Sequence, residues 1–377
     1  MKPELSLHGR TLQLQRYPVR QNETLQAWDA ADEYLINYVS ENYDALDPDR
    51  PILLMNDSFG ALGCWYSQYG KVVSVTDSFI AKQATLANLN ANQLDEVTLS
   101  DCLAALPDAP QLVLLKLPKN NRLLSWQLRQ LCQSLPAGTM VIAAAKAKEI
   151  HTSTLKLFEK YLGDTKTSLA VKKARLIFCQ VNPELSQPLP APLEWQVQEH
   201  GLTLTNHANV FSGESLDIGA RFFLEHLPAD NRYEKIVDLG CGNGVIGIKA
   251  AQLNPDAKIV CVDESFMAAA SCRHNANINL SDPSQLTAVV NNCLEGMPAD
   301  DTDLVLCNPP FHQQNTITDH IAWQMFCDAR HVLRQGGKLW VIGNRHLGYN
   351  DKLKRLFGNV TVVAQNNKFV IYQSTKS

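Results

Sequence analysis

The sequence predicts an α/β protein made of two tandem, doubly wound Rossmann-like domains, of which the N-terminal copy is degenerate. Two observations lead to this fold class. Short apolar runs alternate with segments of helical length in both halves of the 377 residues, which is typical of parallel sheets covered by helices on both faces. In addition, the two halves carry related motifs in the same order, which indicates a duplicated domain and not a short-period repeat.

The second half shows the alternation most clearly. Helix-length segments at 244–253 and 265–277 separate short apolar runs of the kind found in buried parallel strands. Near the end, 359–372 holds two β-rich runs around a polar turn, which predicts an antiparallel hairpin at the sheet edge. The strand candidates are 236–239, 259–262, 288–291, 304–307 and 338–342.

The duplication is visible residue by residue. Matched segments stay in order, and the offset between partners grows only from 184 to 192. Each half therefore repeats a whole domain. The matched pairs are 51–63 with 235–247, 72–79 with 259–266, 88–90 with 275–277, and 112–116 with 304–308.

The two copies are joined by a proline-rich stretch. Pro183, Pro188, Pro190 and Pro192 lie close together, and so many prolines disfavour both a helix and a central strand. We therefore assign 1–182 to the degenerate N-terminal domain, 183–199 to a linker, and 200–377 to the C-terminal domain.

The composition indicates a globular protein without a membrane anchor or a metal. Hydrophobic residues make up 45% and charged residues 19% of the chain, and no apolar run reaches the roughly 18 residues that span a bilayer. The ten cysteines include no C-x-x-C pair and no Cys/His cluster with zinc-like spacing. We expect reduced thiols, no bound metal and a cytoplasmic location.

The strand candidate at 236–239 runs into a glycine-rich turn, and in a doubly wound sheet such a turn is where ligands bind. The pattern is D-x-G-x-G-x-G and not the dinucleotide pattern G-x-G-x-x-G, because a valine stands where the third glycine is needed. It resembles motif I of class I S-adenosylmethionine methyltransferases. In that resemblance the glycines let the backbone approach the cofactor, and the acid accepts from its ammonium group. The residues that would bind S-adenosyl-L-methionine here are Asp238, Gly240, Gly242 and Gly244.

Other residues extend this site. Asp263 ends the second strand candidate, where a carboxylate binds both ribose hydroxyls in related nucleotide folds. Asn292 follows the third strand candidate, and an Asp or Asn there commonly contacts the adenine amino group in this enzyme class. Upstream of the first strand, where the family has a lid and a helix beside the cofactor, Phe211 and Asp217 are candidates for cofactor contacts or, equally, for packing and capping roles.

The fourth strand candidate is followed by Asn308-Pro309-Pro310-Phe311. Proline has no N–H to give to a sheet, so this tetrapeptide forms a stiff loop at the carboxyl end of the strand. It resembles motif IV of amino-methyltransferases, and we take Asn308, Pro309, Pro310 and Phe311 as the catalytic residues.

The chemistry of the tetrapeptide suits a planar amine, whose lone pair is delocalised into its ring. The side-chain oxygen of Asn308 and the carbonyl of Pro309 can each accept one amino hydrogen, which aims the lone pair at the methyl group. The Phe311 ring can stack on the planar substrate. No strong general base is needed to start the attack.

The N-terminal copy departs from both motifs. Its turn, 54–60, lacks the acid and two of the three glycines. Lys116-Leu117-Pro118-Lys119 replaces the catalytic tetrapeptide. We therefore predict that this domain binds no S-adenosylmethionine.

A basic block lies in the same copy. Residues 110–176 hold 12 basic and 3 acidic side chains, a balance of +9, whereas residues 1–109 have a balance of −8. A phosphate backbone responds to such a patch more than to the net charge of −4. We expect RNA binding there, with solvated lysine-rich helices as the alternative. The RNA-binding candidates are Lys116, Lys119, Arg122, Lys146 and Lys148.

Together these motifs resemble the bacterial ribosomal RNA guanine-N2-methyltransferases over nearly the whole chain. The combination of Val-Phe-Ser … Leu-Asp-x-Gly, Asp-x-Gly-Cys-Gly and Asn-Pro-Pro-Phe-His is specific to that group. The opening segments 11–18 and 25–35 resemble its large-subunit members, which implies N2 of one guanine in 23S rRNA as the target. We expect the protein to be a monomer.

Three other functions stay open on the sequence. A 16S rRNA guanine-N2-methyltransferase shares these motifs, and a protein glutamine N5-methyltransferase uses the similar Asn-Pro-Pro-Tyr. Phe311 in place of Tyr, the basic block and the duplication favour RNA over protein. The third is a non-enzymatic RNA-binding or assembly factor with a relic site, against which the intact motifs argue. The motifs themselves indicate amino methylation, and they do not distinguish guanine N2 from adenine N6 or glutamine N5.

Overall fold

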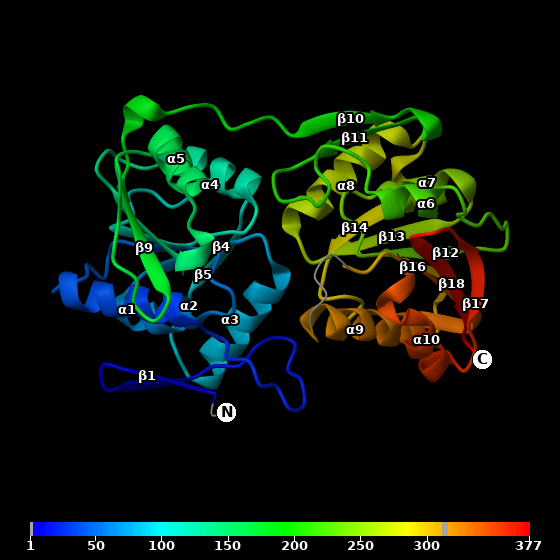
Figure 1. The fold of residues 1–377 in the computed structure, drawn as a ribbon, viewed down its shortest axis with the longest axis horizontal. Helices are drawn as coiled ribbons and strands as arrows, with labels where there is room; N and C mark the ends of the chain where they lie inside the picture. Colours follow the sequence, from blue (N-terminus) through cyan, green and yellow to red (C-terminus); the bar gives the residue numbers. More distant parts are fainter. Residues whose placement is uncertain (1–2, 311–315) are drawn as a thin grey trace. The chain divides into compact units, whose positions relative to one another are not determined.

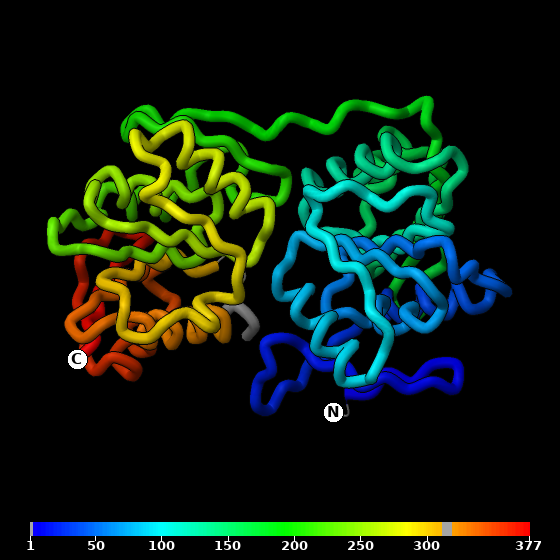
Figure 2. The backbone as a smooth tube through the Cα atoms, turned by 180° about the vertical axis from the view of Figure 1, so that it is seen from behind, coloured from blue at the N-terminus to red at the C-terminus, as the bar shows by residue number. Residues whose placement is uncertain are grey.

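The computed structural model describes residues 3–310 and 316–377. The chain forms two compact units, Met1–Ala191 and Pro192–Ser377. Each unit consists of a sheet with helices on both faces and a two-stranded hairpin that comes before the sheet in the chain (Figures 1 and 2).

The division between the units falls inside the segment 183–199 that the sequence assigns to a linker. The last part of that segment is not a connection, because Leu193–Val197 is strand β10 of the second unit. The prolines of the segment all precede β10, so they remove no hydrogen-bond donor from its pairing with the next strand.

The first unit is built on a seven-stranded sheet in the order β5-β4-β3-β6-β7-β9-β8. The first five strands in this order are parallel, and β9 and β8 are antiparallel to their neighbours. The strands are β1 (Glu4–Leu7), β2 (Arg10–Gln13), β3 (Ile52–Met55), β4 (Val72–Thr76), β5 (Thr98–Asp101), β6 (Leu112–Lys116), β7 (Met140–Lys146), β8 (Thr165–Thr167) and β9 (Ala174–Gln180). The helices are α1 (Ala30–Asn42), α2 (Ala61–Tyr66), α3 (Phe79–Ala91), α4 (Asn121–Ser134) and α5 (Thr152–Tyr161).

The second unit repeats this plan with the order β14-β13-β12-β15-β16-β18-β17. Again the first five strands are parallel and the last two antiparallel. The strands are β10 (Leu193–Val197), β11 (Leu202–Asn206), β12 (Lys235–Leu239), β13 (Lys258–Asp263), β14 (Leu286–Val290), β15 (Thr302–Cys307), β16 (Leu333–Asn344), β17 (Thr361–Gln365) and β18 (Phe369–Thr375). The helices are α6 (Ile218–Leu224), α7 (Val245–Leu253), α8 (Phe266–Asn279), α9 (Thr316–Val332) and α10 (Tyr349–Phe357).

The two units correspond element by element, which confirms the predicted tandem α/β architecture. One contact is repeated down to its atoms. Asn88 on α3 accepts from the Gln15 N–H at 3.0 Å and donates to the carbonyls of Gln15 and Phe59 at 3.0 and 2.8 Å. Asn275 on α8 makes the same three bonds in the second unit. A duplicated domain accounts for such a match, and convergence of packing does not.

Apolar side chains cover both faces of the second sheet. Ile236 and Ile259 belong to a cluster with α6, α7 and α8, whereas Val237 and Val262 pack with α9 and α10. Figure 1 shows these two groups of helices on opposite sides of the strands. Because both faces are buried, the strands are continuous apolar runs, and polar side chains gather at the strand ends.

The C-terminal elements agree with the predicted edge hairpin. Strand β18 pairs with β16 and β17 pairs only with β18, so the hairpin closes the sheet with β17 at the edge. One predicted strand is shifted: β14 ends at Val290, which leaves Asn291 and Asn292 in the following turn. Within the described residues, no helix is both long and apolar enough to cross a membrane.

Candidate active site

The glycine-rich turn lies between β12 and α7, at the carboxyl end of an interior strand. Gly240, Gly242 and Gly244 have φ angles of 74°, 53° and 85°, in the left-handed region that a Cβ disfavours. A Cβ on Gly244 would lie 2.4 Å from the Cys272 sulfur, so this glycine allows α7 and α8 to pack closely. A Cβ on Gly242 would meet nothing within 4 Å. The turn therefore offers open space at Gly242, as a ligand-binding turn requires.

Asp238, the acid of this motif, is buried and only 3% exposed. Its Oδ2 accepts from the Gly247 N–H at 2.8 Å, which fastens the first turns of α7 to the end of β12. Burial raises the pKa of Asp238 to about 8. Asp238 thus supports the turn from the protein side. Its predicted contact with the cofactor's ammonium group stays a prediction.

Asp263 joins the turn to the next helix. Its Oδ2 accepts from the Gly242 N–H at 2.9 Å, and its Oδ1 accepts from the Ser265 N–H at 3.0 Å. Ser265 caps α8 by accepting from the Ala268 N–H at 3.1 Å. Asp263 is half-buried at the carboxyl end of β13. It therefore lies on the same edge of the sheet as the glycine turn, where the sequence places the ribose.

Asn292, the candidate for the adenine contact, is enclosed in its own turn. It is 2% exposed, and its Nδ2 donates to the Glu295 carboxylate at 3.0 Å. The neighbouring Asn291 donates to the Glu295 carbonyl at 2.8 Å and accepts from the Asn292 N–H at 2.9 Å. The side chain of Asn292 is thus buried and bonded within its own turn, and its contact with the adenine stays a prediction.

Asn308 follows β15, the parallel neighbour of β12, so it lies beside the glycine turn. A Cβ on Gly240 would lie 3.8 Å from the Asn308 carbonyl oxygen. The side-chain Oδ1 of Asn308 is buried and accepts no hydrogen bond from any described residue. A buried acceptor without a partner costs about 1–3 kcal/mol. That cost is recovered when a hydrogen-bond donor enters the site.

The rest of the tetrapeptide is described only in part. Pro309 is buried and Pro310 is exposed. Phe311, the residue expected to stack on the substrate, lies outside the described residues.

The segment between β11 and α6 carries the two remaining candidates. Phe211 is 59% exposed, so it is not a core residue. Asp217 is the N-cap of α6, and its Oδ2 accepts from the Ala220 N–H at 3.2 Å. The sequence allows Asp217 a cofactor contact or a capping role, and the structure shows the capping role.

Sequence reasoning misses the side chains that hold this segment. Trp195 donates from Nε1 to the Gly213 carbonyl at 3.0 Å, and Asn206 donates to the carbonyls of Ser212 and Gly213 at 3.4 and 3.3 Å. Both come from hairpin β10–β11. Asn275 is also missed, although the Asn-x-x-x-Asn pattern occurs at equivalent places of both halves and is a signal that could have found it.

In the first unit, the counterpart of this site is filled by its own side chains. Asn56 stands where the second unit has Gly240, and it keeps a left-handed φ of 64°. Its Nδ2 donates to the Lys116 carbonyl at 3.0 Å, and it exchanges two amide hydrogen bonds of 2.9 Å with Gln127. The Asn56 side chain therefore lies between the turn and the residue that replaces Asn308.

Lys116 is that replacement, and it is buried. Its Nζ donates to Asp29 Oδ1 at 2.9 Å and to Asp32 Oδ1 at 2.8 Å. Burial lowers the pKa of Lys116, but the two carboxylates outweigh this and raise the pKa above its ordinary value. The ammonium group is thus charged and already paired inside the fold. The ammonium group of Lys116 therefore bonds two carboxylates, and its predicted contact with an RNA phosphate stays a prediction.

The other basic candidates lie nearer to solvent. Lys119, Lys146 and Lys148 are exposed, and Arg122 is half-buried. Lys119 follows β6, while Lys146 ends β7 and Lys148 lies just beyond it. Because β6 and β7 are parallel neighbours, these three lysines share the carboxyl edge of the first sheet.

Metal-binding geometry is absent from the described part of the chain, in which no three His, Cys, Asp or Glu side chains are placed to hold an ion. The ten cysteines are free thiols.

Known proteins resemble both units. Residues 2–183 match the family model of the RLMG N-terminal domain, and residues 201–373 match the methyltransferase small domain. The chain is 67% identical to the ribosomal RNA large subunit methyltransferase G of Photobacterium profundum and 59% identical to that of Vibrio vulnificus, over 100% of both chains in each case. A solved 16S rRNA N2 methyltransferase of T. thermophilus, in complex with AdoMet and guanosine, has a TM-score of 0.78 at 20% identity, over 99% of this chain and 97% of that one.

Proposed function

Because this chain belongs to the family of ribosomal RNA large subunit methyltransferase G, we propose that it transfers a methyl group from S-adenosyl-L-methionine to the exocyclic N2 of one guanine in 23S rRNA. Family membership supports large-subunit rRNA as the substrate. The T. thermophilus structure supports the fold alone at its 20% identity. We further propose that the enzyme is a cytoplasmic monomer that needs no metal.

The buried Oδ1 of Asn308 is the observation that carries the proposal. It accepts no hydrogen bond from the described residues, and the backbone carbonyl of the same residue lies beside Gly240 of the glycine turn. An amino group on a planar base has two hydrogens to donate, and the Pro309 carbonyl is the second acceptor within the same tetrapeptide. The choice of guanine N2 among the amino groups of RNA rests on the resemblance to the ribosomal RNA guanine-N2-methyltransferases, because the motifs themselves indicate only amino methylation.

The residues around the glycine turn fit the cofactor. Gly242 leaves the space that a Cβ would fill, and Asp263 lies at the adjacent strand end as the proposed partner of the ribose. Asp238 and Gly244 support the turn from the protein side. Phe211 and Asp217 are the proposed contacts from the segment before the sheet. S-adenosyl-L-methionine, when bound, supplies an electrophilic methyl group on a sulfonium centre.

The tetrapeptide then orients the nucleophile. With one amino hydrogen on Asn308 and the other on Pro309, the N2 lone pair would be held out of the ring plane and available to the cofactor's methyl group. The cofactor would supply that methyl group, and N2 would release one proton to solvent. Acceptors that are already in place cost no reorganisation at that moment.

The first unit is the proposed RNA-binding domain. Lys119, Lys146 and Lys148 share one sheet edge, and with Arg122 they are the proposed contacts to the phosphate backbone. Such contacts make rRNA affinity fall steeply with salt. We propose that this unit binds no S-adenosylmethionine, because Asn56 replaces Gly240 and Lys116 replaces Asn308, and both side chains are bonded to other residues of the fold.

The test is to incubate the purified protein with labelled S-adenosylmethionine and unmodified 23S or 16S rRNA, and to map the label by nuclease digestion and mass spectrometry. We expect label on guanine N2 of 23S rRNA. Asn308→Ala should lower kcat by roughly 100- to 1,000-fold, the usual effect of losing one positioned polar group, and leave the Kd for the cofactor unchanged. Asn308→Asp keeps an acceptor oxygen and is the matched control, so it should retain more activity than the alanine variant.

Each other outcome contradicts a part of the proposal. Label on 16S rRNA would assign the small-subunit reaction, and label on a protein glutamine would remove RNA as the substrate. Tight rRNA binding without any label would leave a binding or assembly factor. Equal activity of Asn308→Ala and the wild type would remove Asn308 from the mechanism.

A further inference from the structure

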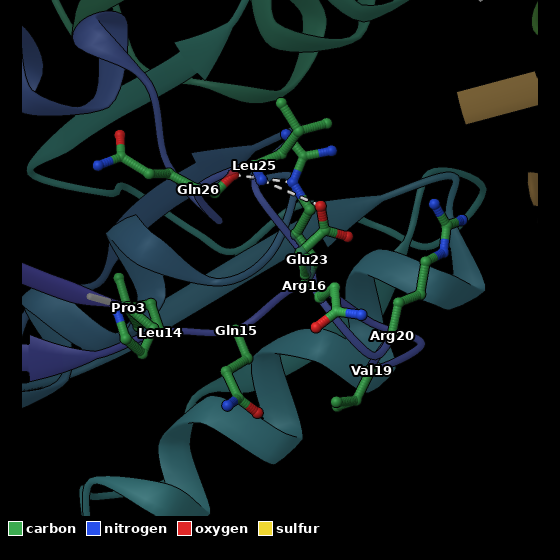
Figure 3. A pocket seen from close by; sticks show the side chains of 10 residues that line it. Pro3, Leu14, Gln15, Arg16, Val19, Arg20, Glu23, Leu25 and Gln26 are labelled. Atoms are coloured by element: carbon green, nitrogen blue, oxygen red, sulfur yellow. Dashed lines mark hydrogen bonds between the residues drawn. The ribbon is translucent and has the colours of Figure 1, made fainter. Parts of the chain in front are cut away.

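A cavity of about 270 Å³ in the first unit is lined by residues outside both strand-end sites described above. It opens between the start of the chain and the segment 14–29, which connects β2 to α1 (Figure 3). By the duplication, this segment is the counterpart of the one that carries Phe211 and Asp217 in the second unit. By the proposed function, the segment in the first unit has no cofactor to cover, because Asn56 and Lys116 replace Gly240 and Asn308.

The polar wall of the cavity is fixed in position. Arg16 donates from Nε to the Gln26 carbonyl at 2.8 Å, and its guanidinium carbon lies 4.9 Å from the centre of the Phe59 ring. The Glu23 carboxylate accepts from the Leu25 N–H at 3.0 Å (Figure 3). A guanidinium and a carboxylate are thus held on one loop, as donor and acceptor for the edge of a planar heterocycle.

The rim combines aliphatic side chains with a second positive charge. Val19 is 70% exposed and Leu25 is 45% exposed, and both line the cavity. Arg20 lines it as well, one residue away from Val19. Exposed aliphatic groups beside an arginine provide an apolar surface for one face of a base and a partner for its phosphate.

We propose that this cavity, which we name the hairpin pocket, binds one unpaired nucleotide of ribosomal RNA. The base lies against Val19 and Leu25, Arg16 and Glu23 contact its edge, and Arg20 contacts its phosphate. The volume is below the roughly 300–1,000 Å³ of pockets that take drug-sized ligands, which favours a single nucleotide over a larger group. The inference rests on the proposed function only in taking rRNA as the ligand.

Two variants separate the base from the phosphate. Val19→Ser combined with Leu25→Ser removes the apolar surface without touching a charge, and both positions are exposed, so the fold is retained. Arg20→Ala removes the phosphate contact. Leu169→Ser, at a residue 87% exposed elsewhere in the first unit, is the apolar control. Lys71→Ala is the charge control, since Lys71 is exposed directly before β4, at the amino edge of the sheet.

The measurement is the Kd of the full chain for unmodified 23S rRNA between 50 and 300 mM KCl, with methyl transfer followed in parallel. We expect the double serine variant to bind roughly 5- to 100-fold more weakly with an unchanged salt slope, because base stacking is not a counterion effect. Arg20→Ala should reduce the slope of log K against log salt by about 0.7–0.9. Both control variants should match the wild type.

The hairpin pocket is overturned if the double serine variant binds like Leu169→Ser while the wild type binds and methylates 23S rRNA. It is also overturned if Arg20→Ala changes the salt slope no more than Lys71→Ala does. If the wild type neither binds nor methylates 23S rRNA, the proposed function fails, and the nucleotide assignment of the pocket fails with it. Parallel methyl transfer distinguishes that case from failure of the pocket alone.

Discussion

One backbone amide shows how the two units diverged. In the second unit the Gly247 N–H donates to Asp238, at the end of a strand, at 2.8 Å. In the first unit the equivalent amide, Gly63, donates at 2.9 Å to Asp57, which lies within the turn. Leu54 occupies the position of Asp238. Because the fold keeps a carboxylate on this amide even where the cofactor motif is lost, the acid of the motif has a structural task of its own.

The buried Asp238 predicts a pH-dependent stability. Its pKa is about 8 in the folded protein and about 3.9 in an unfolded chain. Between these values the unfolded chain is ionised and the folded chain keeps the proton, so the free energy of unfolding falls as pH rises, by up to about 1.4 kcal/mol per pH unit. Asp238→Asn still accepts from Gly247 and does not titrate. In urea unfolding, the free energy of unfolding of Asp238→Asn should rise relative to that of the wild type as the pH goes from 5.5 to 8.

The exposed Asp256 provides the control for this measurement. Asp256→Asn should follow the wild type across the same range. The raised pKa of Asp238 would be contradicted if the free energies of unfolding of Asp238→Asn and the wild type differed by the same amount at every pH.

Substitution of two glycines of the turn should have different effects, one mainly on stability and the other mainly on cofactor affinity. Gly244→Ala would place a Cβ 2.4 Å from the Cys272 sulfur at a left-handed φ, and overpacking with this strain should destabilise the fold by roughly 2–4 kcal/mol. Gly242→Ala meets no atom within 4 Å, so it should cost only the strain of about 1–2 kcal/mol. Its Cβ would enter the proposed cofactor space and raise the Kd for S-adenosylmethionine at least tenfold. Calorimetric titration and thermal unfolding measure the two effects, and wild-type affinity in Gly242→Ala would refute the placement.

At the scale of elements, each N-terminal hairpin is tied to the sheet by asparagines of a helix. Asn275 and Asn279 bond the backbone of β11 at Thr205 and Thr203, and Asn275 also donates to the Asn243 carbonyl of the glycine turn at 2.9 Å. The hairpin in turn holds the segment that carries Phe211 through Trp195 and Asn206. One helix face thus positions two sides of the proposed cofactor site.

Substitution of these asparagines separates stability from binding. Asn275→Ala leaves one buried donor and two acceptors without partners, so it should destabilise the second unit by about 3 kcal/mol and weaken S-adenosylmethionine binding severalfold. Asn88→Ala breaks the same three bonds in the first unit. It should cost similar stability and leave cofactor affinity unchanged. Equal losses of affinity in both variants would show that the contact acts only through global stability.

At the scale of the whole molecule, the two units share one architecture and differ in what occupies the strand ends. The second unit leaves open space at Gly242 and a buried Asn308 oxygen without a described partner. The first unit closes the equivalent place with an amide pair and with a lysine between two carboxylates. Because the sheet order is the same, these substitutions alone account for the predicted loss of cofactor binding.

The closed strand ends of the first unit predict the stoichiometry of cofactor binding. The full chain should bind one S-adenosylmethionine, measured by calorimetry. The ion pair of Lys116 and Asp32 predicts an energetic coupling between these two residues. Lys116→Ala leaves the buried Asp32 without its partner and should destabilise the first unit by about 3–5 kcal/mol. The double variant Lys116→Ala/Asp32→Ala should be more stable than the sum of the single losses by about 2 kcal/mol or more. A second bound cofactor would refute the closed site, and additive losses would refute the pairing.

Much of the fold followed from local patterns. The strands of the second half, its edge hairpin and the duplication are encoded in runs of apolar residues and in the order of the motifs, and the structure has them. The segment 183–199 predicted as a linker includes β10, because β10 has little apolar pattern of its own and is defined by its pairing with β11. Trp195 and Asn206 were missed for the same reason, since their partners are backbone carbonyls that no side-chain pattern reveals.

The sequence by itself determined the features that depend on neighbours along the chain. Left-handed backbone at Gly240, Gly242 and Gly244 favours glycine, and two prolines after β15 end the strand whatever surrounds it. Only the tertiary structure decided which polar groups are buried. Asp238 and Lys116 both read as ligand-binding side chains, yet each is enclosed and already paired. Burial depends on elements that are distant in sequence and pack against the residue. A local motif therefore identifies a residue but does not determine whether its side chain is buried.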